Sequence, residues 1–87
     1  MSKNRNEQET YSRNMGFEYR AEFNASNQVI YEGWAYPIGA ATNEGSLIWQ
    51  ILQHSYDASG NLTKSSWANY SDAFDKSWTL RGNYSYA

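Results

Sequence analysis

The sequence contains no cysteine, a single histidine and a single proline. Without cysteine the fold cannot be cross-linked by disulfides, and the redox compartment is left open. A structural zinc site takes about four nitrogen or sulfur ligands, so His54 alone does not predict one. A chain of 87 residues buries only about 60% of its unfolded surface, which leaves a small core. Among the devices that stabilise small folds, association with copies of itself or with a larger assembly remains.

Charge and long apolar runs are also sparse. The net charge is −2, and no cluster of Lys and Arg interleaves with the aromatic residues, so nucleic acid and anionic membranes are not favoured as partners. No run approaches the roughly 18 apolar residues of a membrane-spanning helix. The polar start MSKNRNEQET lacks the apolar centre of a secretion signal. We therefore expect a protein made inside the cell that binds no membrane, nucleic acid, cofactor or small-molecule substrate.

Aromatic residues, in contrast, are abundant. Four Trp, eight Tyr and three Phe stand beside one Val, four Ile and four Leu. Each aromatic side chain buries about 150–250 Å², and Tyr and Trp carry polar tips that suit a half-wet surface. The aromatics either fill a β-core, in line with their preference for strands, or exceed what a small core can hold and line interfaces.

Alternation of apolar and polar residues predicts an all-β fold. Residues 17–23 alternate most cleanly, with Phe17, Tyr19, Ala21 and Phe23 on one face and charged residues on the other. Strands are predicted over residues 17–23, 29–36, 47–56, 62–68 and 80–86, with one short helical turn over residues 71–78. This pattern predicts a small five-stranded antiparallel barrel or sandwich.

Two expectations concern packing within these strands. Gly33 interrupts the second strand, which indicates a bulge or a close approach of another group to the backbone. Trp49 and Ile51 share the more apolar face of the third strand, so we expect both to point inward, with Trp34 or Trp67 nearby.

Residues 1–16 are polar, rich in Asn and without a period, which predicts an extended arm ahead of a single β-domain over residues 17–87. Only Tyr11 and Met15 are sizeable apolar groups in the arm, too few to offset the entropy of ordering it alone. We therefore expect the arm to order on a neighbouring subunit, where Tyr11 inserts and Lys3, Arg5 and Arg13 meet acidic groups.

The stretch YDASGNLTKSSWANY raises three alternatives. Asp57, Ser59 and Asn61 alternate like calcium ligands, but an EF-hand loop needs Gly at position 6 and Glu at position 12, where this chain has Leu62 and Ala68. The string YDASGNLT resembles one YD repeat of large secreted toxin and adhesion proteins, yet such repeats work in arrays and no second copy is present. The turn interpretation is favoured: Asp57 bonds back to the chain, a glycine supplies positive φ, and two strands are joined.

Residues for catalysis are scarce. His54 has Ser55 and Asp57 as its nearest sequence companions, which is ordinary for the end of a strand, so we expect a solvent-facing strand histidine. Asp72 and Asp75 are three residues apart and could act as a carboxylate pair, but at the start of a helical turn we expect them to cap it. No catalytic, metal or cofactor site is predicted, and the protein is not expected to be an enzyme.

Several short strings follow one another at defined spacings between Tyr31 and Arg81. They are Tyr31-x-Gly33-x-Ala35, Gly39-Ala40-Ala41-Thr42, Trp49-x-Ile51, Tyr56-Asp57, Gly60-Asn61, Trp67-Ala68, Phe74-Asp75-Lys76-x-Trp78 and Arg81. This pattern, over Tyr31 to Tyr86, resembles a group of short proteins encoded by tailed bacteriophages. That group tends to have basic residues where this chain has Leu52-Gln53 and acidic residues where it has Thr79-Leu80, and we expect these departures to change the partner surface.

The resemblance implies a structural part of the virion rather than an enzyme. On this hypothesis the protein is made in the host cytoplasm and sits in the virion in many copies, decorating the head or joining the head-to-tail or tail assembly. Its partners would be other virion proteins and copies of itself. The alternative is a small recognition module that binds glycan or another protein through exposed aromatic residues. The residues predicted to form the interface are Tyr11, Arg13, Leu52, His54, Tyr70, Tyr84 and Tyr86.

Overall fold

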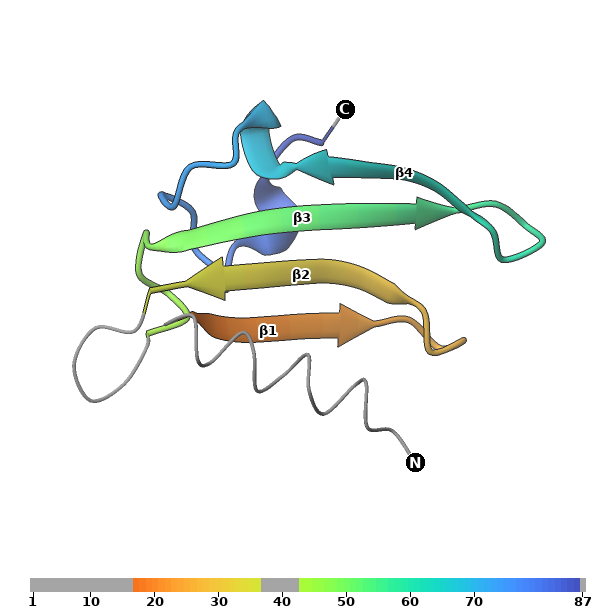
Figure 1. Ribbon diagram of the computed structural model, residues 1–87, viewed down its shortest axis with the longest axis horizontal. Coiled ribbons are helices and arrows are strands. Elements are labelled where there is room, and N and C mark those ends of the chain that lie inside the picture. The colour runs from red at the N-terminus through yellow and green to blue at the C-terminus, as the bar shows by residue number, and fades with distance from the viewer. Residues whose placement is uncertain (1–16, 37–42, 87) are drawn as a thin grey trace.

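The computed structural model describes residues 17–36 and 43–86. They form the strands β1 (Glu18–Phe23), β2 (Val29–Ala35), β3 (Trp49–Tyr56) and β4 (Leu62–Trp67), and two single turns of 3-10 helix, η1 (Ala68–Tyr70) and η2 (Arg81–Asn83). All neighbouring strands are antiparallel, and the sheet order β1-β2-β3-β4 follows the chain (Figure 1). The expected all-β class is therefore confirmed. The predicted arm of residues 1–16 lies outside the described residues.

The described sheet is open and has four strands, where the sequence predicted a five-stranded barrel or sandwich. The predicted fifth strand, residues 80–86, contains η2 instead. The reason is local. The amides of Leu80, Arg81 and Asn83 each donate to a carbonyl three residues earlier, so these amides cannot donate to a neighbouring β-strand. The helical turn predicted over residues 71–78 is also wrong, because Lys76 there forms an isolated bridge with Trp49.

Both tight hairpins are closed by a side-chain carbonyl or carboxylate oxygen. Asn24 Oδ1 accepts from the amides of Ser26 (2.9 Å) and Gln28 (3.0 Å). Asp57 Oδ1 accepts from the amides of Ser59 and Asn61, both at 2.9 Å. The glycine that follows, Gly60, has a φ of 87°, which favours glycine.

The turn interpretation of YDASGN is thereby confirmed. The bonds to Asp57, above all the one from the Asn61 amide, hold its pKa below the ordinary value. Within residues 17–36 and 43–86, no three His, Cys, Asp or Glu side chains gather as metal ligands would. The same residues form no helix that is long and apolar enough to cross a membrane.

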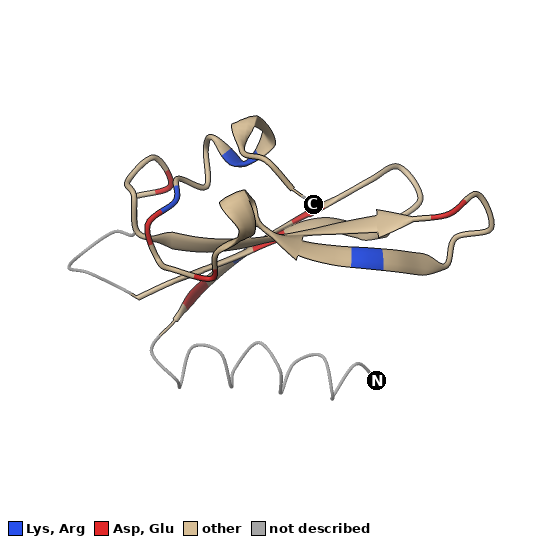
Figure 2. Ribbon diagram, turned by 90° about the horizontal axis from the view of Figure 1, so that it is seen from above, with Lys and Arg blue, Asp and Glu red and all other residues tan. Residues whose placement is uncertain are grey.

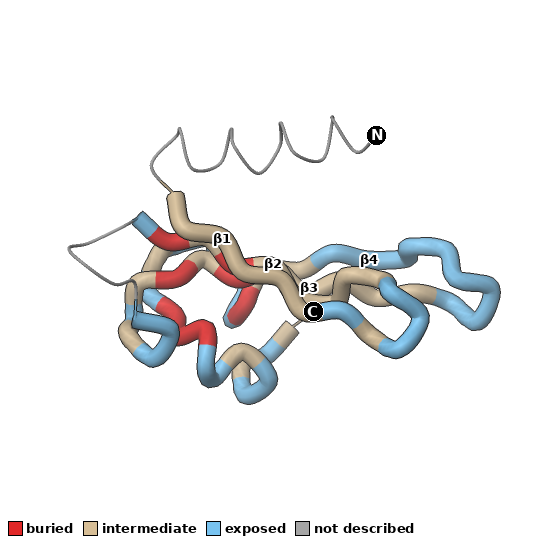
Figure 3. The backbone as a smooth tube through the Cα atoms, turned by 90° about the horizontal axis from the view of Figure 1, so that it is seen from below, coloured by how far each residue is buried: buried red, intermediate tan, exposed pale blue. Residues whose placement is uncertain are grey.

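The segment that follows β4 covers one side of the sheet, which we call the covered face (Figures 2 and 3). The buried core on this side consists of Ala35, Trp49, Ile51, Ala68 and Trp78. Trp49 and Ile51 thus point inward, as predicted. Their aromatic neighbour is Trp78, whose ring centroid lies 6.0 Å from that of Trp49, whereas Trp34 or Trp67 was expected there.

Gly33 permits this close packing. A Cβ atom at Gly33 would lie 2.6 Å from Cε3 of Trp78 and 3.2 Å from Cε3 of Trp49. Real Cβ contacts are rarely that short, so the absent side chain makes room for the Trp78 ring directly on β2. Of the two alternatives predicted for Gly33, the close approach is confirmed.

The charged side of β1 faces the covered side of the sheet. The guanidinium of Arg20 lies 5.4 Å from the ring centroid of Trp49, and its Nε donates to Glu44 at 2.6 Å. At the other end, Arg81 Nε donates to Glu22 at 2.8 Å. β1 is an edge strand, so its long charged side chains can cover the rim of the core while their heads stay near solvent. The apolar side of β1 therefore turns to the opposite side of the sheet.

Candidate functional site

The side of the sheet opposite the C-terminal segment is called the open face. Alternation and strand register assign to it Tyr19 and Ala21 of β1, Glu32 and Trp34 of β2, Gln50, Leu52 and His54 of β3, and Ser65 and Trp67 of β4. Among the described residues outside the strands, the loop of residues 71–75 reaches this face. The carbonyl of Asp72 in that loop accepts a bond from Gln50 Nε2 at 2.9 Å.

Aromatic rings form a row that crosses the open face from β1 to β4. The ring centroids of Tyr19 and Trp34 are 5.7 Å apart, and those of Trp34 and Trp67 are 6.2 Å apart. The ring planes within these pairs are inclined by 53° and 60°. Spacings of 4.5–7 Å with inclined planes are favourable for aromatic pairs, so the row is a continuous, packed apolar strip.

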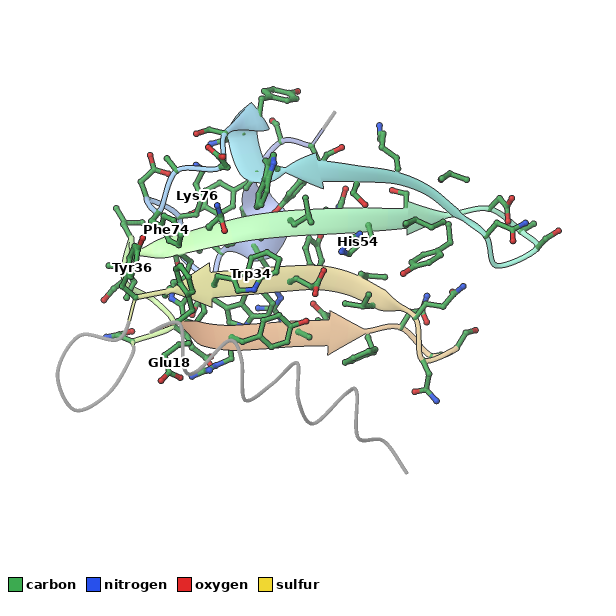
Figure 4. All side chains as sticks on the ribbon, viewed as in Figure 1. Glu18, Trp34, Tyr36, His54, Phe74 and Lys76 are labelled. Carbon is green, nitrogen blue, oxygen red and sulfur yellow. The ribbon has the colours of Figure 1, made fainter. Side chains whose placement is uncertain are left out.

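A second aromatic cluster lies beside the start of β1. Phe17, Tyr36 and Phe74 pack pairwise, with ring centroids 4.8, 4.9 and 5.8 Å apart. Figure 4 shows Tyr36 and Phe74 together at the end of the sheet where β2 finishes, while Trp34 and His54 lie over its middle. Phe74 comes from the loop of residues 71–75, so this cluster also attaches that loop to the sheet.

Polar side chains form a second row that runs across all four strands. The Tyr19 hydroxyl donates to Glu32 Oε2 at 2.5 Å, His54 Nε2 lies 2.6 Å from Glu32 Oε1, and His54 Nδ1 lies 2.7 Å from Ser65 Oγ. A carboxylate only accepts, so Nε2 donates to Glu32 Oε1. When Nε2 carries the single ring proton, Nδ1 accepts from the Ser65 hydroxyl.

The polar row is internally satisfied. Each of its four members bonds another member, and the side chains of His54 and Glu32 are only 11% and 22% exposed. In the described part of the chain, no buried side-chain nitrogen or oxygen lacks a hydrogen-bond partner. The row therefore links the four strands and places no unpaired polar group on the open face at these positions.

Ser65, His54 and Glu32 also have the order of a nucleophile, a base and an orienting acid, with distances in the range such groups use. Sequence reasoning missed this arrangement because Ser65 and Glu32 are 11 and 22 residues from His54, and only the strand register brings them together. Acyl transfer further requires donors placed about 3 Å from the developing oxyanion. Holding the strands in register, in contrast, requires only the hydrogen bonds that Ser65, His54 and Glu32 already make.

The predicted interface residues lie in several places. Leu52 and His54 are on the open face, and Tyr11 and Arg13 lie outside the described residues. Tyr70 is 68% exposed and has a φ of 63° at the end of η1. Tyr84 and Tyr86 lie on the covered face against the core. The structure therefore brings Leu52 and His54 together and separates them from the remaining described positions.

Tyr84 and Tyr86 make specific bonds within the chain. The Tyr84 hydroxyl accepts from the Ser77 amide at 2.8 Å, and the Tyr86 hydroxyl donates to the Arg81 carbonyl at 2.7 Å. Burial raises the pKa of Tyr86 above its ordinary value. Both side chains help attach the C-terminal segment to the sheet.

Sequence reasoning missed most of the open face, including Tyr19, Trp34 and Trp67. The alternation over residues 17–23 identified one apolar face of β1 but not the side of the sheet to which it turns. That side is decided by the position of Trp78 over Gly33, a contact between distant segments that no local pattern encodes.

Comparison with known proteins assigns no family. No protein-family model, curated protein or solved structure matches this chain. Function is therefore inferred from the geometry of the open face and from the sequence pattern between Tyr31 and Tyr86.

Proposed function

We propose that the protein is a non-enzymatic structural component of a tailed-bacteriophage particle and packs on neighbouring virion proteins through the open face. The choice of the open face as the contact surface rests on one observation: an aromatic row lies beside a polar row whose groups already bond one another. Removing apolar surface from water is favourable, and a polar group that keeps its bond costs little more to bury. The open face therefore gains stability when another protein covers it.

The distribution of charge supports a protein partner. The strands carry five charged residues, which are Glu18, Arg20, Glu22, Glu32 and Lys64. Alternation and register place only Glu32 on the open face, where it bonds His54 and Tyr19. The centres of protein interfaces are likewise poor in charge and rich in aromatic residues.

The orientation of β1 supports the same surface. Its charged side chains lie over the rim of the covered face, and its apolar side, with Tyr19 and Ala21, turns to the open face. An amphipathic strand gains free energy when its apolar side is the drier one. The open face of β1 thus has the composition of a surface that becomes dry in an assembly.

The particle itself is proposed from the resemblance described above, and the position within the particle is the head, the head-to-tail region or the tail. On this proposal the chain reaches the virion after synthesis in the host cytoplasm. The partners are other virion proteins and copies of the chain itself.

A recognition module for glycan is the second candidate, favoured by the position of the aromatic row beside the polar row. The inclinations of 53° and 60° between neighbouring rings prevent all three from lying flat under one sugar chain. Ser65, His54 and Glu32 already bond one another, which reduces what they can offer to sugar hydroxyls. Both features favour a protein partner over a sugar.

Mass spectrometry of purified particles tests the proposal. We expect this protein at a fixed, multiple copy number per particle. Leu52→Glu, which places a charge on the open face, should lower its incorporation at least about tenfold, since an unpaired charge in an interface costs more than 1.4 kcal/mol. Leu80→Glu makes the same change at a position that is 45% exposed in the C-terminal segment and should leave incorporation unchanged. Absence of the protein from purified particles would refute the proposal.

A further inference from the structure

We infer that the open face pairs with the open face of a second copy, so that two sheets stack as a β-sandwich about a two-fold axis. This inference rests on the proposed function in that both use the same surface, and it names what covers that surface. Stable domains are built from at least two packed layers. Among the described residues, the segment after β4 supplies such a layer on the covered face (Figure 3) and reaches the open face with the loop of residues 71–75.

The size of the open face fits a small dimer. Its strands have six to eight residues. With a rise of about 3.3 Å per residue and a strand spacing of about 4.8 Å, four such strands cover a plane of about 400–500 Å². Projecting side chains make the accessible area larger than this plane. A standard interface buries about 800 Å² per partner, so the open face lies near the lower end, and a dissociation constant of about 1–100 µM is expected.

Self-pairing also suits the chemistry of the face. A two-fold axis brings each group near its own copy, so a charge at the centre would repel itself. The centre of the open face instead has Leu52, which pairs across β3 and β4 with Trp67 and across β2 and β3 with Glu32. The one carboxylate that the strands place there, Glu32, already bonds His54. Sheets that pack about 10 Å apart would bring the aromatic rows of both copies into contact.

Sedimentation velocity of the full chain, from about 1 to 300 µM, tests the inference. We expect a concentration-dependent shift from the monomer to the dimer mass within that range. Leu52→Glu and Leu52→Lys should each weaken dimerisation at least about 100-fold, because like charges then face each other across the axis. An equimolar mixture of the two variants should dimerise again. Leu80→Glu and Leu80→Lys are the matched controls and should dimerise as the unmodified chain does.

A measurement on the unmodified chain keeps the test independent of how well the Leu52 variants fold. In a mixture of isotope-labelled and unlabelled protein, intermolecular NOEs should connect the indole protons of Trp34 and Trp67 to open-face residues of the other copy. Intermolecular NOEs confined to other surfaces, such as Tyr70, would overturn the inference.

The remaining outcomes also decide the matter. A chain that stays monomeric at 300 µM overturns the inference. So does a chain that dimerises only after residues 2–14 are deleted, because that result would mean that these residues cover the open face in the full chain. A monomer whose Trp34 and Trp67 resonances shift with a neutral oligosaccharide overturns it in favour of glycan. A monomer that is nevertheless present in purified particles refutes the dimer and leaves the proposed function intact, whereas a dimer that is absent from particles does the reverse.

Discussion

Replacing Gly33 with alanine tests the packing of the C-terminal segment on the sheet. The new Cβ would lie 2.6 and 2.9 Å from two carbons of the Trp78 ring, so the ring must move by roughly 1 Å to reach ordinary contact distances. Trp78 has little freedom to move, because it is 5% exposed and the guanidinium of Arg81 lies 4.4 Å from its ring centroid. The clash therefore has to be absorbed by the core.

The expected cost follows from two opposing effects. Overpacking a core costs about 1–3 kcal/mol, whereas alanine restricts the unfolded chain and returns about 0.4–1 kcal/mol. We expect a net loss of about 1–2 kcal/mol in the free energy of unfolding, which for a domain of this size lowers Tm by about 4–16 °C. Thermal unfolding followed by near-ultraviolet circular dichroism, which reports on the packed Trp side chains, measures the change.

Gly82→Ala is the matched control, since no atom lies within 4 Å of a Cβ built at Gly82. It should leave Tm unchanged or raise it slightly. Combining Gly33→Ala with Trp78→Ala should cost less than the sum of the two single changes, because the clash disappears with the ring. If Gly33→Ala is as stable as Gly82→Ala, Trp78 does not pack on β2 as described.

Four further expectations concern the core, the hairpin and the polar row. Trp49→Ala should cost about 3–5 kcal/mol, so a soluble, cooperatively folded variant with an unchanged Tm would contradict the burial of Trp49. Millimolar calcium should leave Tm unchanged, since Asp57 bonds the turn amides; a rise of several degrees would show that a metal binds there. The pKa of Asp57 is lower in the folded chain than its ordinary value of 3.8. The stabilisation of the fold by the Asp57 carboxylate is therefore fully present above pH 3.8 and is lost as the pH falls through the lower pKa of the folded state. A titration of the Ser59 and Asn61 amide resonances would follow this loss. A fluorophosphonate probe should not label Ser65, and labelling that disappears in His54→Ala would instead indicate a reactive nucleophile.

A last expectation concerns residues 1–16, which lie outside the described residues. Deleting residues 2–14 should leave the fold and Tm of the domain nearly unchanged and reduce incorporation into particles, because the arm is proposed to bind neighbouring subunits. Full incorporation of the shortened chain would show that residues 2–14 are not needed for assembly.

The strands were predictable because alternation is a local signal. The predicted ranges for β1, β2 and β4 differ from the observed ones by a single residue at an end, and both hairpins follow from turn residues such as Asn24 and Asp57. The C-terminal segment was not predictable in the same way. Leu80, Gly82, Tyr84 and Tyr86 alternate like a strand, but the segment is attached by side chains, through Trp78 over Gly33 and the Tyr84 hydroxyl at Ser77.

The candidate site was predictable only in part. His54 and Leu52, which the sequence analysis placed in the predicted interface, both lie on the open face, but the partners of His54 come from β2 and β4 through the strand register. The side to which Tyr19 turns depends on where Trp78 lies, which is a tertiary choice. A sequence pattern can identify the two faces of a strand, whereas contacts between distant segments decide which of them is covered.

The agreement between strand order and chain order has a consequence for the protein during its synthesis. Each hairpin can form as soon as its second strand has left the ribosome, because each strand pairs with the one made just before it. The layer over Trp49 arrives last, and the bond from Arg81 to Glu22 joins residues 59 positions apart. Until Trp78 and Arg81 emerge, the nascent sheet exposes apolar side chains on both faces, which is the condition under which nascent chains aggregate or recruit chaperones. Ribosomal pausing between β4 and Trp78 would therefore be the most hazardous interval in the production of this protein.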